Sequence, residues 1–185
     1  CKGAVVAGVF TQNAFCAAPV RLCQKHLEVS DVRYLLINTG NANAGTGKLG
    51  VDNALITCRA LAEQVDVPVE AILPFSTGVI GEPLPVDKIV AAIPAALSSL
   101  SEENWRAAGL GIMTTDTLPK GSVRVFDFEG HTYTVAGISK GAGMIRPNMA
   151  TMLGYVFSDI AMDKVLLQSI LKTVVNKSFN RITID

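Results

Sequence analysis

The segment SKGAGMIRPNMATML (139–153) places a lysine, two glycines and an Arg-Pro-Asn turn directly before an Ala-Thr pair. A threonine can act as a nucleophile without histidine once cleavage of the preceding peptide bond frees its own α-amine. The pKa of such an amine is about 7.7–8.0, so a useful fraction is neutral near physiological pH. A rigid turn would hold that peptide bond, and the small Ala150 would let Oγ of Thr151 reach its carbonyl carbon. The residues alone favour a simpler alternative, a Pro-Asn turn that leads into a buried strand.

Two further segments carry polar groups that could serve a site. PFSTGVIGEPLP (74–85) places Ser-Thr-Gly after an expected strand, where consecutive backbone N–H groups could bind an oxyanion. Its glycine, Gly78, would let the backbone approach a ligand closely. MTTDTLPKG (113–121) carries threonines and an aspartate, a composition that usually forms local side chain–backbone caps. Taken alone, each segment is better interpreted as a connecting loop.

The two histidines do not indicate a histidine-activated nucleophile. His131 is expected at a hairpin corner as a solvated turn residue, and His26 lies in a mixed polar segment. Carboxylate pairs suited to glycosidic chemistry are not evident. If the chain has a nucleophile, its base is therefore not expected to be histidine.

GTGKLG (45–50) satisfies G-x-G-x-x-G, follows an expected strand and opens an expected helix, as in a dinucleotide-binding turn. TGNANA separates it from the strand, however, and Asp66 lies at the foot of the helix rather than after a second strand. A Walker A motif fails too, because leucine follows the lysine and alanine replaces the leading glycine. A turn with a helix start is the preferred interpretation. The neighbouring asparagines are interpreted as turn formers: Asn38, Asn41 and Asn43.

Periodicity predicts the elements that would position these residues. Strands rich in Val, Ile, Tyr and Phe are predicted at 4–10, 32–38, 70–75, 122–128, 131–139 and 151–159. Glu129-Gly130 is a predicted two-residue hairpin turn. Helices are predicted at 51–65, 101–110 and 163–178, the second capped by Ser101 and the third with one wide buried face. This order predicts an α/β layered sandwich with a mixed or antiparallel sheet rather than a doubly wound sheet.

Composition excludes several classes of partner. The 185 residues suffice for one sizeable domain, and 49% of them are hydrophobic. Because 16 basic residues balance 16 acidic ones, no nucleic acid or anionic membrane is expected as a partner. The most apolar stretch, 88–100, is too short to span a bilayer, and no secretory signal opens the chain. Four cysteines without a C-x-x-C pair indicate reduced thiols in the cytoplasm.

Longer motifs follow one another along the chain: AGVFTQNAFCAAPV, NTGNANAGTG, PFSTGVIGEPLP, MTTDT and KGAGMIRPNMATML. In these motifs the sequence resembles the ornithine acetyltransferase family, also called the bifunctional arginine biosynthesis protein or glutamate N-acetyltransferase. The resemblance covers essentially the whole chain, and the last motif is the most specific. It implies the fold group of the ornithine acetyltransferases and β-aminopeptidases.

The resemblance also implies self-cleavage. In the family, the bond before the threonine of the NMAT motif breaks autocatalytically, which corresponds here to the bond between Ala150 and Thr151. Residues 1–150 would then be the α-chain portion and 151–185 the start of the β chain, within one structural unit truncated at both ends. Thr151 would be the nucleophile. Both residues stand in one continuous chain in this sequence.

Further residues take their implied roles from the matched motifs. Thr77 and Gly78 of the STG motif would form the oxyanion hole. Substrate would be contacted by Thr114 of MTTDT, Lys140 of SKGAGM and Thr151 itself. In the family the β chain continues beyond the position of Asp185 and contributes a glutamate and further polar residues to the site.

The implied activity is that of an acyltransferase of arginine biosynthesis. The acetyl group of N-acetylornithine would pass to glutamate through an acetyl-threonine intermediate in a ping-pong cycle. No metal or organic cofactor is implied, although acetyl-CoA is a second acetyl donor in the bifunctional, multifunctional members. The expected assembly is an α/β heterodimer that forms a higher homo-oligomer.

Two other functions are compatible with parts of the sequence. A threonine nucleophile would also serve an aminopeptidase of a related fold, which an assay of acetylornithine plus glutamate against small peptides would separate. A non-catalytic nucleotide-binding α/β module would be built around 45–50 and would bind NAD or ATP.

Overall fold

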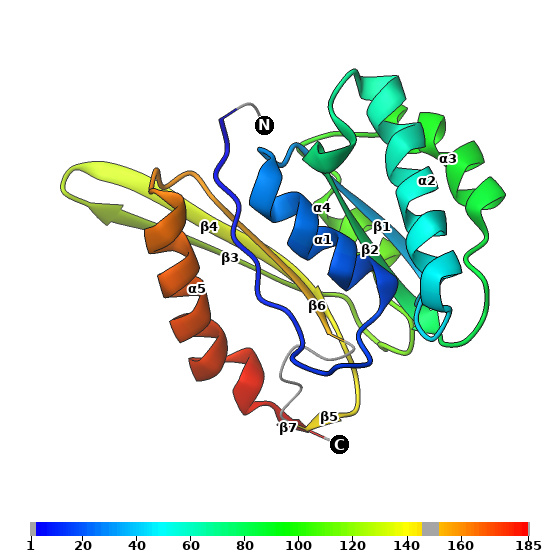
Figure 1. Ribbon diagram of the computed structural model, residues 1–185. Helices are drawn as coiled ribbons and strands as arrows, with labels where there is room; N and C mark the ends of the chain where they lie inside the picture. Colours follow the sequence, from blue (N-terminus) through cyan, green and yellow to red (C-terminus); the bar gives the residue numbers. More distant parts are fainter. Residues whose placement is uncertain (1–2, 146–151, 185) are drawn as a thin grey trace. The chain divides into compact units, whose positions relative to one another are not determined.

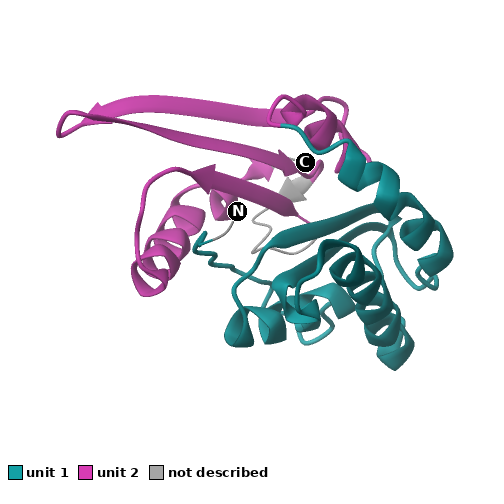
Figure 2. Ribbon diagram, turned by 90° about the horizontal axis from the view of Figure 1, so that it is seen from above, with its two compact units in different colours: residues 1–101 teal, residues 102–185 magenta. Residues whose placement is uncertain are grey.

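The computed structural model describes residues 3–145 and 152–184, and the chain divides into two compact units, residues 1–101 and 102–185 (Figures 1 and 2). The Ala150–Thr151 bond therefore lies outside the described residues. The division between the units falls well before that bond, so it is a different feature from the predicted cleavage.

The first unit combines helices with a parallel pair of strands. Its elements are α1 (Ala18–Val29), β1 (Tyr34–Asn41), α2 (Gly47–Val65), the 3₁₀ turn η1 (Val69–Ala71), β2 (Ile72–Val79) and α3 (Val86–Ser98). β1 and β2 pair in parallel, with Tyr34 opposite Ile72 and Gly40 opposite Gly78. Parallel neighbours need a long crossover, which α2 provides. α1 and α2 pack against β2, and α3 packs against α2 (Figure 1).

The core of this unit lies between β2 and the helices, with α1 and α2 against β2 and α3 against α2. Its buried residues are Leu22, Ala54, Cys58, Leu61, Ala62, Ile72 and Ile93. Ala54, Cys58 and Leu61 follow the three- and four-residue spacing that predicted the helix, which is confirmed and begins earlier, at Gly47. Burial raises the pKa of the Cys58 thiol to about 12 and also raises that of Cys23. Both groups therefore remain protonated thiols, which are poor nucleophiles.

His26 is a core residue rather than part of a polar segment. It lies on α1, a helix that the sequence analysis did not predict, and only 2% of its surface is exposed. Its Nδ1 lies 2.7 Å from the carbonyl oxygen of Ile72. Because a carbonyl oxygen can only accept, Nδ1 carries the proton in this arrangement. The bond gives the buried Ile72 carbonyl a hydrogen-bond donor and links α1 to β2.

The second unit is built on an antiparallel sheet. Its elements are α4 (Trp105–Gly111), β3 (Lys120–Phe128), β4 (His131–Lys140), β5 (Met144–Ile145), β6 (Leu153–Ser158), α5 (Lys164–Lys177), the 3₁₀ turn η2 (Phe179–Arg181) and β7 (Thr183–Ile184). β4 lies between β3 and β6, and β5 pairs with β7. Glu129 and Gly130 both have positive φ, 50° and 81°, as a type I′ hairpin turn requires. The predicted hairpin and the α/β class with both kinds of pairing are confirmed.

The predicted strand at 4–10 is wrong. These residues have no regular secondary structure. Their apolar pattern has another cause, because Val6 and Phe10 pack against a small core cluster that contains Cys23, Val32 and Leu73. An extended segment can bury side chains in this way without forming the hydrogen-bond ladder that defines a strand.

The predicted cap at Ser101 is also wrong. Residues 102–104 form a turn, and α4 begins at Trp105 with Asn104 as its N-cap residue. The helical hydrogen bonds start there, with Ala108 N donating to Asn104 O at 2.9 Å. Ser101 thus precedes the helix by a full turn and cannot cap it.

The helix predicted at 163–178 is confirmed, but its wide buried face is not. Asp163 caps α5 by accepting hydrogen bonds from the N–H groups of Val165 and Leu166, both at 2.9 Å. Only a narrow stripe of α5 is covered, along Leu167, Leu171 and the buried Val175. A second apolar row is exposed in the part of the chain that the structure describes: Leu166, Ile170 and Val174. Among the described helices, none is both long and apolar enough for a bilayer crossing.

Replacing His26 with leucine should lower stability. The substitution leaves the buried Ile72 carbonyl without its partner, at a cost of about 1–3 kcal/mol. Thermal unfolding of the complete gene product by calorimetry measures the effect. His131→Leu is the matched control, because His131 is exposed at the start of β4 and should change stability little. Equal melting temperatures for the His26 variant and the wild type would contradict the role assigned to this bond.

Candidate functional site

Thr77 and Gly78 lie at the end of β2, inside the strand. The expectation of a loop here is wrong, because residues 76–79 continue the pairing of β2 with β1. Gly78 has φ of 136°, and a Cβ atom on it would lie 2.3 Å from the carbonyl carbon of Gly40. The same Cβ atom would lie 2.6 Å from the backbone nitrogen of Asn41. Both the backbone angle and the contact with β1 therefore require glycine.

Hydrogen bonds from asparagine side chains hold this end of the two strands together. The Ser76 hydroxyl donates to Oδ1 of Asn38 at 2.6 Å, and Nδ2 of Asn38 donates to the Asn41 carbonyl at 2.9 Å. Nδ2 of Asn41 donates in turn to the carbonyls of Glu82 and Pro83, at 3.2 and 3.0 Å. The loops that follow β1 and β2 are thus joined directly beside Thr77 and Gly78.

Asn43 extends this network to the start of α2. It is fully buried, its φ is 48°, and its N–H donates to Oδ1 of Asn41 at 2.8 Å. Its Nδ2 donates to the Gly50 carbonyl at 2.8 Å, and its Oδ1 accepts from the Thr46 hydroxyl at 3.1 Å. The asparagines are therefore cross-links between segments, which goes beyond the predicted role as turn formers.

The glycines of GTGKLG (45–50) open α2, which confirms the preferred interpretation of this segment as a turn with a helix start. Gly50 illustrates their packing role, because a Cβ atom there would lie 2.0 Å from Oγ1 of Thr46. The nucleotide-binding alternative gains no support from this geometry.

A second group of predicted site residues lies in the other unit. Lys140 is the last residue of β4, and 5% of its surface is exposed. Thr114 is exposed in the segment between α4 and β3. Their common neighbour is Asp116, a buried residue that the sequence analysis did not select as a site residue.

The carboxylate of Asp116 accepts hydrogen bonds from three points of the chain. Oδ1 accepts from Nζ of Lys120 at 2.5 Å and from the N–H of Gly141 at 2.8 Å. Oδ2 lies 3.5 Å from the N–H of Thr114. Burial by itself raises the pKa of this carboxyl, but the donors and the positive charge of Lys120 outweigh it and hold the pKa below its usual range. Asp116 is therefore ionised at neutral pH.

The pKa of Lys140 depends on the same charged groups, Asp116 and Lys120. Burial lowers the pKa of its ammonium group, because water no longer stabilises the charge. The negative charge of Asp116 opposes this effect, whereas the positive charge of Lys120 adds to it. The net pKa lies below the usual lysine value, so Lys140 loses its charge at a lower pH than a solvated lysine.

The described part of the chain contains two sets of predicted site residues. Thr77 and Gly78 belong to the first unit, whereas Thr114 and Lys140 belong to the second, where Asp116 links their segments. Ala150 and Thr151 lie outside the described residues. Among the residues that are described, no group of three or more His, Cys, Asp or Glu side chains could hold a metal ion.

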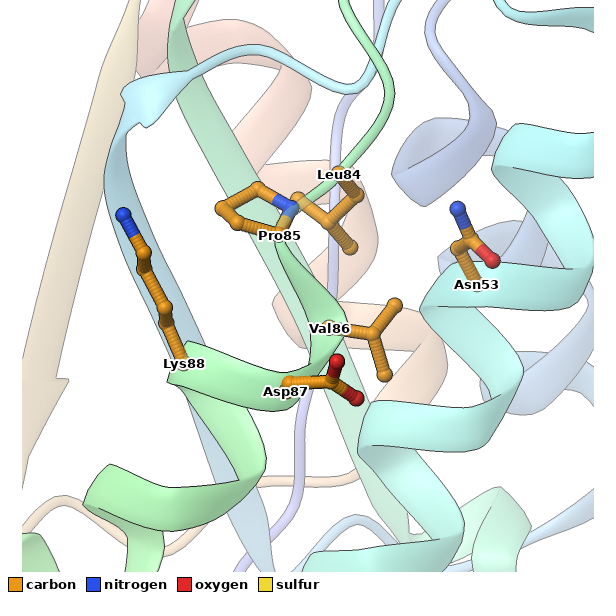
Figure 3. A pocket seen from close by; sticks show the side chains of 6 residues that line it. All are labelled: Asn53, Leu84, Pro85, Val86, Asp87 and Lys88. Carbon is orange, nitrogen blue, oxygen red and sulfur yellow. The ribbon is translucent and has the colours of Figure 1, made fainter.

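A cleft in the first unit has a different lining. It lies between α2 and the start of α3 (Figure 3). Its residues are Asn53, Leu84, Pro85, Val86, Asp87 and Lys88. It includes neither Thr77 nor Gly78, and it offers no cysteine, serine or threonine nucleophile, so we assign it no part in the chemistry.

Comparison with known proteins places this geometry in a family. The sequence profile of the ArgJ family matches residues 1–185. The chain is 61% identical over 184 residues to the arginine biosynthesis bifunctional protein ArgJ of Pseudomonas syringae pv. tomato, covering 100% of this chain and 45% of the relative. It is 62% identical over 184 residues to the protein of the same name from Pseudomonas fluorescens, with the same coverage. The chain thus spans 45% of the length of these relatives.

Two solved structures share the fold. A crystal structure of the arginine biosynthesis bifunctional protein ArgJ from Bacillus halodurans matches with a TM-score of 0.71 and 39% identity, over 80% of this chain and 78% of that one. The ornithine acetyltransferase of Mycobacterium tuberculosis, solved in complex with ornithine, matches with a TM-score of 0.69 and 31% identity, over 78% and 77%. The sequence profile, the close relatives and the shared fold agree, and the chain belongs to the ArgJ family.

Proposed function

We propose that the protein is a self-cleaving acyltransferase of arginine biosynthesis that moves the acetyl group of N-acetylornithine to glutamate. The observation that carries this proposal is the match of the ArgJ family to all 185 residues, including the NMAT motif at 148–151. The ornithine bound to the Mycobacterium tuberculosis relative supports the substrate class. We also propose a cytoplasmic location, an α/β heterodimer after cleavage and a higher homo-oligomer.

The first reaction is cleavage of the chain. Oγ of Thr151 attacks the carbonyl carbon of Ala150, the C–N bond breaks, and the hydroxyl proton passes to the departing nitrogen. An ester then joins the two residues. Water hydrolyses it, which leaves a carboxylate on Ala150 and returns the hydroxyl to Thr151 together with a free α-amine.

The second reaction uses that amine as the base. It accepts the proton of the Thr151 hydroxyl as Oγ attacks the acetyl carbonyl of N-acetylornithine, and it returns a proton to the leaving ornithine amine. The amine of glutamate then attacks the threonine ester and carries the acetyl group away. Neither step requires a metal or an organic cofactor. The word bifunctional in the names of the relatives supports a second activity, for which we propose acetyl-CoA as the donor.

The residues of the two units have different tasks in this scheme. Thr77 and Gly78 stabilise the negative oxygen of the tetrahedral intermediate, a role that suits a backbone fixed by its pairing with β1. Thr114 and Lys140 contact the substrate. N-acetylornithine and glutamate both carry an α-carboxylate, so the one ammonium group of Lys140 can orient each of them in turn.

Thr151→Ala should abolish both reactions. The wild-type gene product should separate into two chains, the first ending at Ala150, whereas the variant lacks the attacking hydroxyl and should remain a single inactive chain. Intact-mass measurement and amino-terminal sequencing detect cleavage. An assay of acetyl transfer from N-acetylornithine to glutamate measures activity. Thr173→Ala is the control, because that threonine is exposed on α5 and its hydroxyl donates to the Ser169 carbonyl of the same helix. An intact wild type that transfers acetyl groups would exclude this mechanism.

Gly78→Ala should reduce acetyl transfer by roughly 10²–10³-fold in kcat, the usual effect of losing one oxyanion donor. The added Cβ atom would collide with the backbone of β1 and force the end of β2 to move. Gly81→Ala is the matched control: its φ of 87° strains alanine in the same way, but nothing lies within 4 Å of the new Cβ atom. Steady-state kinetics of both variants separate backbone strain from displacement of the donors. A Gly78 variant as active as the Gly81 variant would refute the assignment.

A further inference from the structure

Asp116 has more hydrogen bonds than a local cap requires. Its side chain is 1% exposed, and its partners lie in the segment before β3, at the first residue of β3 and directly after β4. A buried carboxylate is stable only when charged or polar groups compensate for the lost water. These three donors supply that compensation and fix the segment of Thr114 against the end of β4.

We propose that Asp116 is the positioning residue for recognition of the substrate carboxylate: its hydrogen bonds fix the segment of Thr114 and the backbone beside Lys140 relative to one another. The inference rests on the proposed function, since it concerns how the substrate contacts of that reaction are organised. Asp116 itself does not touch substrate, because a carboxylate would repel the carboxylate it helps to bind.

The bond from Gly141 gives the carboxylate its influence on Lys140. Gly141 follows Lys140 directly, so the 2.8 Å bond from its N–H fixes the backbone at the lysine. The bond to Thr114 is longer, 3.5 Å, but it joins the second predicted substrate contact to the same carboxylate. One side chain therefore sets the separation of two groups that must bind the same small molecule.

The charges around Lys140 make the role testable. Asp116 and Lys120 are two charged groups that act on Lys140, and they act in opposite directions. Removing Asp116 makes the buried ammonium group harder to protonate, whereas removing Lys120 makes it easier. Both substitutions break the same ion pair, so a purely structural role predicts similar effects for the two.

The experiment compares Asp116→Asn and Lys120→Met in the complete gene product. For Asp116→Asn we expect KM for N-acetylornithine and for glutamate to rise about 10- to 100-fold, the usual effect of losing a charge-assisted hydrogen bond, with a smaller change in kcat. In the pH profile of kcat/KM, the fall at alkaline pH, where Lys140 loses its proton, should move to lower pH in this variant. In Lys120→Met the same fall should move to higher pH.

Asp127→Asn is the matched control. This aspartate lies on β3, in the same unit as Asp116, and accepts a 2.6 Å bond from the Thr132 hydroxyl, but it is exposed. Its KM values and pH profile should equal those of the wild type. Unchanged KM and an unchanged alkaline fall of kcat/KM in Asp116→Asn, or falls that move in the same direction in both test variants, would overturn the proposal.

A readout independent of turnover separates this inference from the proposed function. The rate at which acetic anhydride labels Nζ of Lys140, followed against pH by peptide mass spectrometry, reports the protonation of that lysine directly. The midpoint should fall in Asp116→Asn and rise in Lys120→Met, whether or not the protein transfers acetyl groups. If the Asp116 variant does not fold, the Lys120 variant decides: a midpoint that stays or falls overturns the proposal, and a rise supports it.

Discussion

Burying a polar group without a hydrogen-bond partner costs about 1–3 kcal/mol, and more when the group is charged. Each unit buries polar side chains near residues proposed for catalysis, and hydrogen bonds from side chains and backbone groups satisfy them. In the first unit, Asn43 is fully buried and bonds to Asn41, Thr46 and Gly50. In the second, the buried carboxylate of Asp116 accepts hydrogen bonds from Nζ of Lys120 and from the N–H of Gly141. Because breaking these bonds leaves buried polar groups unpaired, the chain has little freedom to move at the end of β2, where Thr77 and Gly78 lie, and at the end of β4, where Lys140 lies.

Such rigidity is what an oxyanion hole and a carboxylate site need, since donors that are already in place lose no energy to reorganisation during the reaction. The two units achieve it by different means. At the end of β2 the means are steric, because Gly78 contacts Gly40 so closely that no side chain fits. At the end of β4 the means are electrostatic, because the Asp116 charge fixes a backbone N–H and acts on the neighbouring ammonium group.

Much of this fold could be predicted from the sequence, and the exceptions have physical causes. The strands around Glu129-Gly130 and the helix at 51–65 were predictable because their turn chemistry and periodicity are local. The run at 4–10 was mistaken for a strand because apolar side chains pack equally well from an unpaired segment. Asp116 was missed as a site residue because its partner Gly141 lies 25 residues away in the sequence. Local sequence patterns cannot predict a hydrogen bond between residues so far apart. The site residues themselves came from a resemblance, since each motif taken alone favoured a connecting loop or, at 147–151, a turn leading into a buried strand.

The scarcity of histidine in this sequence follows from the proposed chemistry. When a nucleophile uses its own α-amine as the base, the rest of the protein must stabilise the oxyanion and bind the carboxylate of the substrate. In the proposed mechanism, backbone N–H groups serve the first need, and the buried Lys140 serves the second. Neither need calls for an imidazole, and of the two present His26 bonds a core carbonyl while His131 is exposed at the start of β4. The buried polar residues have positioning tasks instead: Asn41 and Asn43 hold the end of β2 in the first unit, and Asp116 holds the end of β4 in the second.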